Sequence, residues 1–413
     1  MTDPDPNNPN EPGEPNNPSE PGEPNPPPTL PRRTDLGTFG GPSSYAYDVN
    51  DGATVVGEAQ TANGLFRAFR WTSSGGLQEL APLLGDIESR AITVTNDNVA
   101  FGISVSDAGK VRPVTWSAAG EGVELPIPPV AGATLVPSDR NAQGLIVGDA
   151  FFAEGGVHAW AWTASGGLVD LSSELDVPFE NYAAAVNDGG TVVGTMGGGL
   201  WRAYQRPAAG GAQSIGVPGS APERTEVTAH GVNGDGAIVG WTRLIADDVA
   251  SGAVDPFPAV GTYPYLWRPG SGFTLLDVFD AQSESNAVAD DVNARGDVVG
   301  SAVTSDGTIQ AAAWPRAGAI VNLNGADPNP SVALAVNATG IAAGWTSTDG
   351  GAGTNRATVW NLEEAATAVA AHGRGAAKRP AVVPRTVTGA AACLRQRAVM
   401  VSKAKQADCF EGR

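Results

Sequence analysis

Three aspartates in one long segment, "WTRLIADDVASGAVDPFPAVGTYPY" (241–265), come nearest to a metal-binding pattern. Asp247, Asp248 and Asp255 supply the hard oxygen ligands that Ca²⁺ prefers. Their spacing lacks the Asp-x-Asp-x-Asp pattern of calcium loops, so a solvated loop is the competing interpretation. A second acidic segment, "DAQSESNAVADD" (280–291), has the same two interpretations. The only cofactor suggested is therefore Ca²⁺, with these three aspartates as its candidate ligands.

Two tryptophans, Trp241 and Trp345, occupy equivalent positions, each directly after a glycine in a recurring segment. An indole is a large, flat ring with one polar N–H group, so an exposed indole can stack on a sugar. Packing inside the fold, as for the other tryptophans, is the competing interpretation. Trp241 and Trp345 are therefore candidate ligand-binding residues.

The sequence contains no recognisable catalytic signature. Its three histidines, His158, His230 and His372, are scattered and lack metal-ligand spacing. No nucleophile elbow, P-loop or dinucleotide fingerprint occurs in a suitable context. The two cysteines, Cys393 and Cys409, lie in the final stretch, so thiol chemistry is not expected elsewhere. Catalytic residues stay unassigned, and a non-enzymatic protein is favoured.

Composition narrows the fold class and the partners. A net charge of −19 argues against nucleic acid, because phosphate binding needs a basic surface. No apolar run is long enough for a transmembrane segment. Abundant glycine (54) and proline (32), with a charged fraction of 17%, favour many short strands joined by tight turns. We expect an all-β monomer.

A repeat organises the chain. The segment "DVNARGDVVG" (291–300) has seven copies, whose turn position falls at 50, 95, 141, 187, 233, 293 and 337, in steps of 45, 46, 46, 46, 60 and 44 residues. A tryptophan follows 21 residues later in four copies, as in Trp71 and Trp116. The 60-residue step contains the long segment 241–265. Loops that lengthen a repeat often carry function, so this insertion is the first place to look for one.

Asn at the first position and Gly at the fourth are the preferred residues of a type I turn. Five copies have both: Asn141/Gly144, Asn187/Gly190, Asn233/Gly236, Asn293/Gly296 and Asn337/Gly340. Asn50 has the same role with its glycine displaced to Gly52, and the second copy uses Thr95 and Asn98. The short apolar runs on either side predict a β-hairpin. We interpret the repeated asparagines as backbone turns rather than as a site.

Each repeat predicts four short antiparallel strands. Its tryptophan ends the third strand, as in "LFRAFRW" (65–71), and "LQEL" (77–80) forms the fourth. Such a unit is one blade of a β-propeller, so seven copies predict a seven-bladed β-propeller with four-stranded antiparallel blades. The last copy lacks a fourth strand, whereas "TDLGTFGG" (34–41) precedes the first hairpin. We expect this N-terminal strand to pair into the last blade and close the ring.

Three regions are expected along the chain. Residues 1–33 are rich in Pro, Asn and Glu, cannot bury a core, and predict a disordered spacer. Residues 34–362 form the propeller. Residues 363–413 lack the repeat, are basic, as in "AAKRPAVVPRTVTG" (376–389), and predict a disordered tail.

The repeats resemble the HAF repeat family, bacterial proteins described as probable extracellular repeats. "DLGTFGG" (35–41) is similar to the family's leading "LGTLGG". "RAFRW" (67–71), "HAWAW" (158–162) and "RAYQR" (202–206) stand where the family has His-Ala-Phe before a tryptophan. Other copies depart from the triplet, so the chain resembles a divergent member. The resemblance implies an exported or surface-attached repeat protein and transfers no catalytic residue.

These observations favour a non-enzymatic extracellular or cell-surface scaffold that binds or displays a glycan or protein ligand. No basic and then apolar signal region follows Met1, so the expected location rests on the spacer and the resemblance. A polysaccharide-acting hydrolase or lyase, with carboxylates from different blades at the mouth of the channel, is the first alternative. A structural surface-layer component is the second.

Overall fold

The computed structural model describes most of the repeat region. The described residues are 30, 32–175, 180–197, 199–219, 222, 224–244, 261–279, 285–316 and 319–371. They form 28 strands, a short 3-10 helix (Ser172–Glu174) and one α-helix, α1 (Leu362–Ala371). The fold is therefore all-β, as predicted, apart from these two helical segments. No helix among these residues has the length and apolar character needed to cross a bilayer.

Six of the seven sequence repeats, numbered in chain order, contribute four antiparallel strands each, and repeat 7 contributes three. Repeat 1 has β2 (Gly40–Val49), β3 (Val55–Thr61), β4 (Phe66–Thr72) and β5 (Gly76–Leu80), and repeat 2 has β6 (Asp86–Val94), β7 (Ala100–Ser106), β8 (Val111–Trp116) and β9 (Gly122–Glu124). Repeat 3 has β10 (Ala133–Arg140), β11 (Ile146–Phe152), β12 (Val157–Thr163) and β13 (Gly167–Asp170), and repeat 4 has β14 (Asn181–Val186), β15 (Val192–Met196), β16 (Arg202–Arg206) and β17 (Gln213–Ser214).

The strands of the remaining repeats follow the same order. Repeat 5 has β18 (Thr225–Val232), β19 (Ile238–Leu244), β20 (Gly261–Arg268) and β21 (Gly272–Leu275), and repeat 6 has β22 (Ser285–Val292), β23 (Val298–Val303), β24 (Ile309–Trp314) and β25 (Val321–Asn322). Repeat 7 has β26 (Ser331–Val336), β27 (Ile341–Ser347) and β28 (Asn355–Asn361), and its fourth strand is β1 (Arg33–Asp35).

The sheets differ from the prediction of seven separate blades. There are five four-stranded sheets, and the strands of repeats 5 and 6 share one eight-stranded sheet. The two repeats are joined because the start of β20 runs parallel to the start of β22, where Gly261 pairs with Ser285 and Thr262 with Asn286. Between repeats 3 and 4 the same parallel contact is a single bridge, from Val157 to Glu180.

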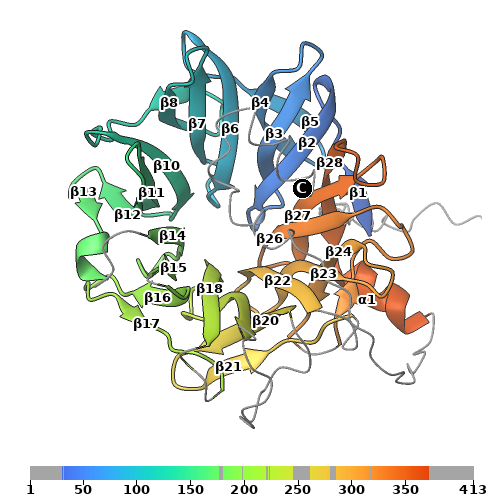
Figure 1. The fold of residues 1–413 in the computed structure, drawn as a ribbon. Coiled ribbons are helices and arrows are strands. Elements are labelled where there is room, and N and C mark those ends of the chain that lie inside the picture. Colours follow the sequence, from blue (N-terminus) through green and yellow to red (C-terminus); the bar gives the residue numbers. More distant parts are fainter. Residues whose placement is uncertain are drawn as a thin grey trace, which may run out of the picture.

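The repeats follow one another in a round arrangement, in which β14, β18, β22 and β26 lie nearer the middle and β13, β17 and β21 lie at the periphery (Figure 1). Neighbouring first strands contact one another in the order β2, β6, β10, β14, β18, β22 and β26, and β26 also contacts β2. Consecutive first strands are therefore neighbours in space, and so are those of repeats 7 and 1.

A β-bulge interrupts every first strand three residues before the turn position, as between Ala46 and Asp48 in β2. Beside the bulge, the second strand has the glycine that ends each copy of the repeated segment. A Cβ on Gly57 would overlap the carbonyl oxygen of Tyr45. Glycine is needed here because the two backbones approach so closely.

The predicted turns form at the repeat asparagines, and in five repeats the glycine N–H donates to the carbonyl of its asparagine. The five pairs are Gly144 to Asn141 (3.1 Å), Gly190 to Asn187 (3.0 Å), Gly236 to Asn233 (3.0 Å), Gly296 to Asn293 (3.0 Å) and Gly340 to Asn337 (3.1 Å). These bonds are the ones that a turn with Asn first and Gly fourth predicts.

The structure refines the role of these glycines. Their φ angles are positive: 83° for Gly144, 77° for Gly190, 75° for Gly236, 86° for Gly296 and 83° for Gly340. Glycine is favoured at the fourth position because the backbone there is left-handed, which costs other residues free energy. The turn motif is therefore one residue longer than a plain type I turn, and its asparagine N–H donates to the carbonyl of the residue after the glycine, as from Asn187 to Thr191 at 3.1 Å.

Repeat 1 departs from the prediction. Its fourth turn position is Ala53, with a φ of 58°, so the left-handed residue is not the displaced Gly52. The N–H of Ala53 donates to the carbonyl of Asn50 at 2.9 Å. The geometry of the turn is therefore kept although the glycine is shifted.

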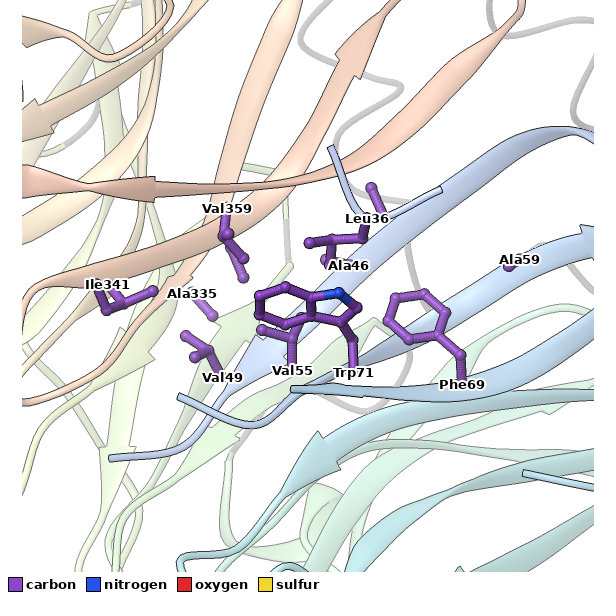
Figure 2. Close-up of a cluster of buried hydrophobic side chains, with 12 residues drawn as sticks. Leu36, Ala46, Val49, Val55, Ala59, Phe69, Trp71, Ala335, Ile341 and Val359 are labelled. Atoms are coloured by element: carbon purple, nitrogen blue, oxygen red, sulfur yellow. The ribbon is translucent and has the colours of Figure 1, made fainter. Parts of the chain in front are cut away.

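Hydrophobic clusters lie between consecutive repeats. Figure 2 shows the one that joins repeats 7 and 1, in which the indole of Trp71 lies between side chains of both repeats, including Val55 and Val359. Trp71 is 7% exposed, and Trp116 and Trp360 are fully buried. The tryptophan that ends the third strand is thus a packing residue, as its phase predicted.

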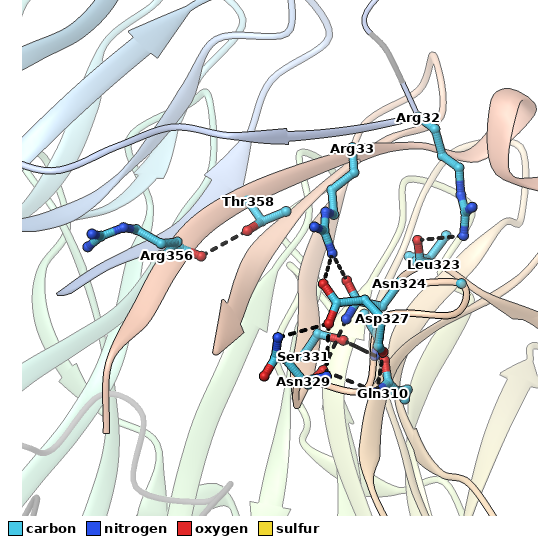
Figure 3. Close-up of polar contacts among 12 residues, drawn as sticks. Arg32, Arg33, Gln310, Leu323, Asn324, Asp327, Asn329, Ser331, Arg356 and Thr358 are labelled. Atoms are coloured by element: carbon cyan, nitrogen blue, oxygen red, sulfur yellow. Dashed lines mark hydrogen bonds and ion pairs between the residues drawn. The ribbon is translucent and has the colours of Figure 1, made fainter. Parts of the chain in front are cut away.

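Residues 30 and 32–35, which we call the N-terminal clasp, contact repeats 6 and 7. Arg33 bonds to Asp327 at 2.7 Å and to Asn324 at 2.6 Å, and Arg32 donates to the carbonyl of Leu323 at 3.4 Å (Figure 3). The N–H of Asn361 donates to the carbonyl of Arg32 at 3.1 Å. Arg32 and Arg33 therefore belong to the folded part and not to the spacer.

The start of the expected tail is also folded. α1 follows β28 directly, and its residues Leu362 and Ala365 are buried in one cluster with Val321 and Leu323 of repeat 6. Residues 363–371 were predicted to be disordered because the repeat pattern ends there. They form a helix instead, because burial of Leu362 and Ala365 against a neighbouring repeat stabilises it.

Candidate functional site

The turn asparagines form a ring of hydrogen bonds at one end of the first strands. Within each turn the Oδ1 atom accepts the backbone N–H four residues later, as from Thr191 to Asn187 at 2.9 Å. The Nδ2 atom donates to the carbonyl of the next turn residue: Asn50 to Thr95 (2.9 Å), Asn141 to Asn187 (3.0 Å), Asn187 to Asn233 (2.9 Å), Asn233 to Asn293 (3.0 Å), Asn293 to Asn337 (2.9 Å) and Asn337 to Asn50 (2.8 Å). Thr95 has no amide, so the ring is interrupted between repeats 2 and 3.

The asparagines are thus ties between repeats as well as turns, which the interpretation as turns alone did not include. The turn glycines contribute only backbone to this ring, at Gly144, Gly190, Gly236, Gly296 and Gly340. Their role is conformational, and the ring as a whole serves the architecture.

Three aspartates lie two residues before the turn position, in repeats 1, 3 and 6. Each accepts a backbone N–H from the next repeat: Asp48 from Val94 (2.7 Å), Asp139 from Val186 (2.8 Å) and Asp291 from Val336 (2.8 Å). The other carboxylate oxygen accepts the N–H of the following residue in the same strand. These carboxylates therefore join neighbouring repeats.

Loss of hydration changes the acidity of these three groups, although the residues as wholes are half-buried. It raises the pKa of Asp139 to about 7 and that of Asp291 to about 6, and it raises the pKa of Asp48. The backbone N–H bonds act in the opposite direction, and the negative charges of Asp48 and Asp291 add to the rise at Asp139. All three carboxyl groups are thus harder to ionise than fully hydrated ones.

The residue after the repeat glycine packs toward the next repeat, and we call it the seam residue. Glu58 pairs with Arg90 at 2.8 Å, and Asp149 accepts the N–H of Ala183 at 2.9 Å. Burial raises the pKa of Asp149 to about 8.

The two candidate tryptophans, Trp241 and Trp345, are the seam residues of repeats 5 and 7. Trp241 is 1% exposed. It presents no face for a ligand, because its side chain is enclosed between repeats. The prediction of ligand binding is therefore wrong for Trp241.

Trp345 differs from the other six seam residues. It is half-buried, whereas the other six are buried: Glu58, Ile103, Asp149, Thr195, Trp241 and Ser301. Its ring meets that of Tyr45 nearly edge-on, with centroids 6.4 Å apart. Tyr45 in turn lies beside Tyr47 (6.5 Å) and Phe66 (6.3 Å), and all four rings belong to half-buried residues. We call these four residues and Arg90 the junction patch, because they come from repeats 7, 1 and 2.

Polar groups hold the side chains of the junction patch. The hydroxyl of Tyr47 donates to Glu58 at 2.7 Å, and the Arg90 guanidinium lies 5.6 Å from the centre of the Tyr47 ring. Burial disfavours the charged form of Arg90, but Glu58 outweighs that effect and raises its pKa. Burial and the Glu58 charge raise the pKa of Tyr47. The Nδ2 atom of Asn355 donates to the Tyr45 hydroxyl at 3.0 Å.

The predicted calcium ligands belong to a segment that the structure does not describe. Asp247, Asp248 and Asp255 lie in 245–260, outside the described residues. Within the part of the chain that the structure describes, no group of three or more His, Cys, Asp or Glu residues is arranged to hold a metal. In the second acidic segment, the Oδ1 atom of Asp290 lies 3.2 Å from the Nδ1 atom of His230 in the preceding repeat.

Sequence reasoning missed Asp48, Asp139 and the arginine of the junction patch, and it included Asp291 only as part of the second acidic segment (280–291). A signal for the aspartates was present, because Asp stands two residues before the turn position in "YDVN", "SDRN" and "DDVN". No comparable signal marks the pairing of Glu58 with Arg90, since the two residues lie in different repeats.

No family model matches this chain, and no curated protein matches it. Among solved structures, the S511A mutant of puromycin hydrolase complexed with PGG has a TM-score of 0.51 at 12% identity, over 80% of this chain and 54% of that chain. This chain thus spans about half the length of that enzyme. The β-propeller domain of the Trilobed protease from Pyrococcus furiosus, described as having an open velcro topology, has a TM-score of 0.49 at 12% identity, over 77% and 96%. A lectin from Burkholderia pseudomallei has a TM-score of 0.40 at 13% identity, over 76% and 98%.

The fold and the comparisons place the chain in one structural class. It is an all-β propeller built from four-stranded antiparallel blades. At these identities the likeness concerns the fold alone.

Proposed function

We propose that this protein is a non-enzymatic binding and display scaffold of the HAF repeat type, located outside the cytoplasm or at the cell surface. The observation that carries the proposal is the use of the carboxylates beside the turns. Asp48, Asp139 and Asp291 each accept a backbone N–H from the next repeat, which is a structural role. The Pro-rich residues 1–33 and the "DLGTFGG" motif (35–41) support the location and the family.

We also infer a closed ring of seven blades. Within the eight-stranded sheet, repeats 5 and 6 each keep four antiparallel strands, and two residue pairs join them. β1 supplies the fourth strand of repeat 7, and the bond from Asn337 to Asn50 links the same two ends. These contacts support closure by the N-terminal strand.

One observation favours the alternative of a polysaccharide-acting enzyme. The raised pKa values of Asp139 and Asp291, about 7 and about 6, suit a general acid near neutral pH. Each of these carboxylates, however, accepts two backbone N–H groups. The scaffold is therefore the better account.

A glycan array followed by turnover assays tests the proposal. Each retained glycan is incubated with the protein and analysed for new reducing ends and for unsaturated ends. The scaffold predicts retention without cleavage. Cleavage that scales with protein concentration, and is lost in both Asp139→Asn and Asp291→Asn, would establish the enzyme instead.

A further inference from the structure

We propose that the junction patch binds a neutral saccharide, with Trp345 as its stacking surface. This inference rests on the proposed binding function and assigns that function a ligand class and a place. The patch lies where the first and last repeats meet and reaches into repeat 2.

Trp345 is more exposed than the seam residues of the other six repeats, and this difference points to the junction patch. Six seam residues are buried between repeats, and Trp345 alone among the seven is half-buried. Its neighbours Tyr45, Tyr47 and Phe66 are half-buried too. Elsewhere in the ring the same position is closed by packing, as at Trp241. The ring planes of Phe66 and Trp345 are inclined to that of Tyr45 by 42° and 74°, so the four partly open rings do not form one plane. The indole of Trp345 is the single flat face that the carbon–hydrogen face of a sugar ring needs.

Hydrogen-bond donors lie at the edge of this aromatic surface. Arg90 uses its Nε atom to bind Glu58 at 2.8 Å, and in the described residues neither Nη atom has a partner. The Tyr45 hydroxyl accepts from Asn355 at 3.0 Å, and no acceptor for its own hydrogen lies among the described residues. A guanidinium and a phenol with free donor capacity fit the hydroxyl oxygens of a sugar.

Charge selects a neutral ligand over an acidic one. Glu58 is paired with Arg90 and balances its charge. The chain as a whole has a net charge of −19, which repels carboxylated sugars. Stacking and hydrogen bonds to uncharged sugar hydroxyls are therefore the interactions that the patch can make.

Calorimetric titration with defined hexasaccharides tests the proposal. The probes are cellohexaose, xylohexaose and mannohexaose, with hexagalacturonate as the acidic probe, titrated into the full chain. At least one neutral probe should bind. Trp345→Leu keeps apolar bulk but removes the ring, so it should weaken that binding by about tenfold or more. Tyr45→Phe keeps the packing but loses the hydroxyl, so it should weaken binding about threefold or more.

Trp241→Leu is the matched control, because it removes the equivalent tryptophan where it is buried. It should lower the midpoint of thermal unfolding and leave the affinity unchanged. Binding that survives both Trp345→Leu and Tyr45→Phe overturns the patch but leaves the scaffold proposal intact. Binding of hexagalacturonate alone, or of no hexasaccharide by the folded wild type, also overturns the patch. Cleavage of a bound hexasaccharide overturns the scaffold proposal while leaving the site in place.

Discussion

At the scale of single residues, the turn asparagines use both ends of one amide group. The Oδ1 atom closes the turn and the Nδ2 atom reaches the next repeat, as in Asn187, which accepts from Thr191 and donates to Asn233. Aspartate or serine could close such a turn, but neither has an amide N–H group in addition to its acceptor oxygen. The recurrence of asparagine is therefore explained by contacts between repeats and not by turn geometry alone.

Asn187→Asp separates these two roles. The carboxylate keeps an acceptor for the turn but cannot donate to the carbonyl of Asn233. The carbonyl of Asn233 keeps the N–H of Gly236 but loses its second donor and faces a negative charge, so the free energy of unfolding should fall by about 2 kcal/mol. Urea unfolding of wild type and variant measures the difference. An unchanged midpoint would mean that the Nδ2 bond contributes nothing.

Asp149 makes stability depend on pH in a predictable direction. Burial raises its pKa to about 8 in the folded state, above the ordinary value of an unfolded Asp. The folded state therefore holds the proton more tightly. This stabilising contribution is complete below the ordinary carboxyl pKa and is lost as pH rises through about 8. Asp149→Asn keeps an acceptor for Ala183 and should show a smaller loss of thermal stability between acidic and alkaline pH.

Asp170 provides the control, because its pKa is shifted in the opposite direction from that of Asp149. Burial alone would raise its pKa, but the bonds from His158 and from the N–H of Ser172 outweigh burial and lower it. Its contribution is present at neutral pH and is lost as pH falls through its lowered pKa. Asp170→Asn should change the pH dependence of thermal stability only on the acidic side. If both variants moved the same pH range, the assignment of Asp149 would be wrong.

At the scale of elements, a backbone N–H of the third strand is matched by a side-chain acceptor in the first strand of the next repeat. In four repeats an alanine N–H donates to a side chain of the next repeat at 2.9 Å: Ala68 to Ser89, Ala159 to Asn181, Ala311 to Ser331 and Ala357 to Ser44. Two third strands have proline at this position, Pro113 and Pro264, and the next repeats have Leu135 and Ala287 at the acceptor position. Proline has no N–H, so no acceptor is needed there. Repeat 4 departs from this matching, with Ala203 and Val227 at the two positions.

Ser331→Ala and Ala287→Ser test this matching. Ser331→Ala leaves the buried N–H of Ala311 without an acceptor and should lower the free energy of unfolding by about 1 to 2 kcal/mol. Ala287→Ser adds a hydroxyl at the acceptor position that corresponds to Pro264 and should give no gain in stability. Chemical unfolding of both variants checks the pair, and stabilisation by Ala287→Ser would refute the matching.

Local sequence predicts turns and strands better than it predicts how deeply their side chains are buried by neighbouring repeats. The Asn-x-x-Gly turns and the phase of Trp71 were readable because each depends on residues within one repeat. Trp241 and Trp345 share the local sequence Gly-Trp-Thr, yet one is buried and the other half-buried. Their burial depends on side chains of the following repeat, which a local pattern does not contain. For the same reason the shared sheet of repeats 5 and 6 could not be predicted.

At the scale of the whole molecule, the two ends of the described chain are held together. β1 pairs with β28, and the N-terminal clasp reaches Asp327 of repeat 6. Leu36, which follows β1, is 6% exposed in the cluster between repeats 7 and 1. The N-terminal segment thus contacts repeats 6 and 7, which lie far from it in the sequence. Arg33 and Asp327, for example, are 294 residues apart.

Two truncated chains isolate the contribution of this segment. A chain that begins at residue 40 lacks β1, the clasp and Leu36, whereas one that begins at residue 30 keeps all three. The shorter chain should unfold several degrees lower, because β28 loses a partner and burial of one leucine alone contributes about 2 kcal/mol. Calorimetry compares them, and equal midpoints would contradict closure of the ring by the N-terminal strand.

The substitution of Thr95 for asparagine determines where the ring is easiest to open. In the described residues no hydrogen bond joins 86–125 of repeat 2 to 133–171 of repeat 3, where the seam residue is Ile103 and the third strand has Pro113. Apolar side chains, among them Phe101 and Trp160, hold this boundary, and such contacts have no fixed direction. We therefore expect repeats 2 and 3 to separate from each other more readily than other neighbouring repeats, because no hydrogen bond between described residues has to break there.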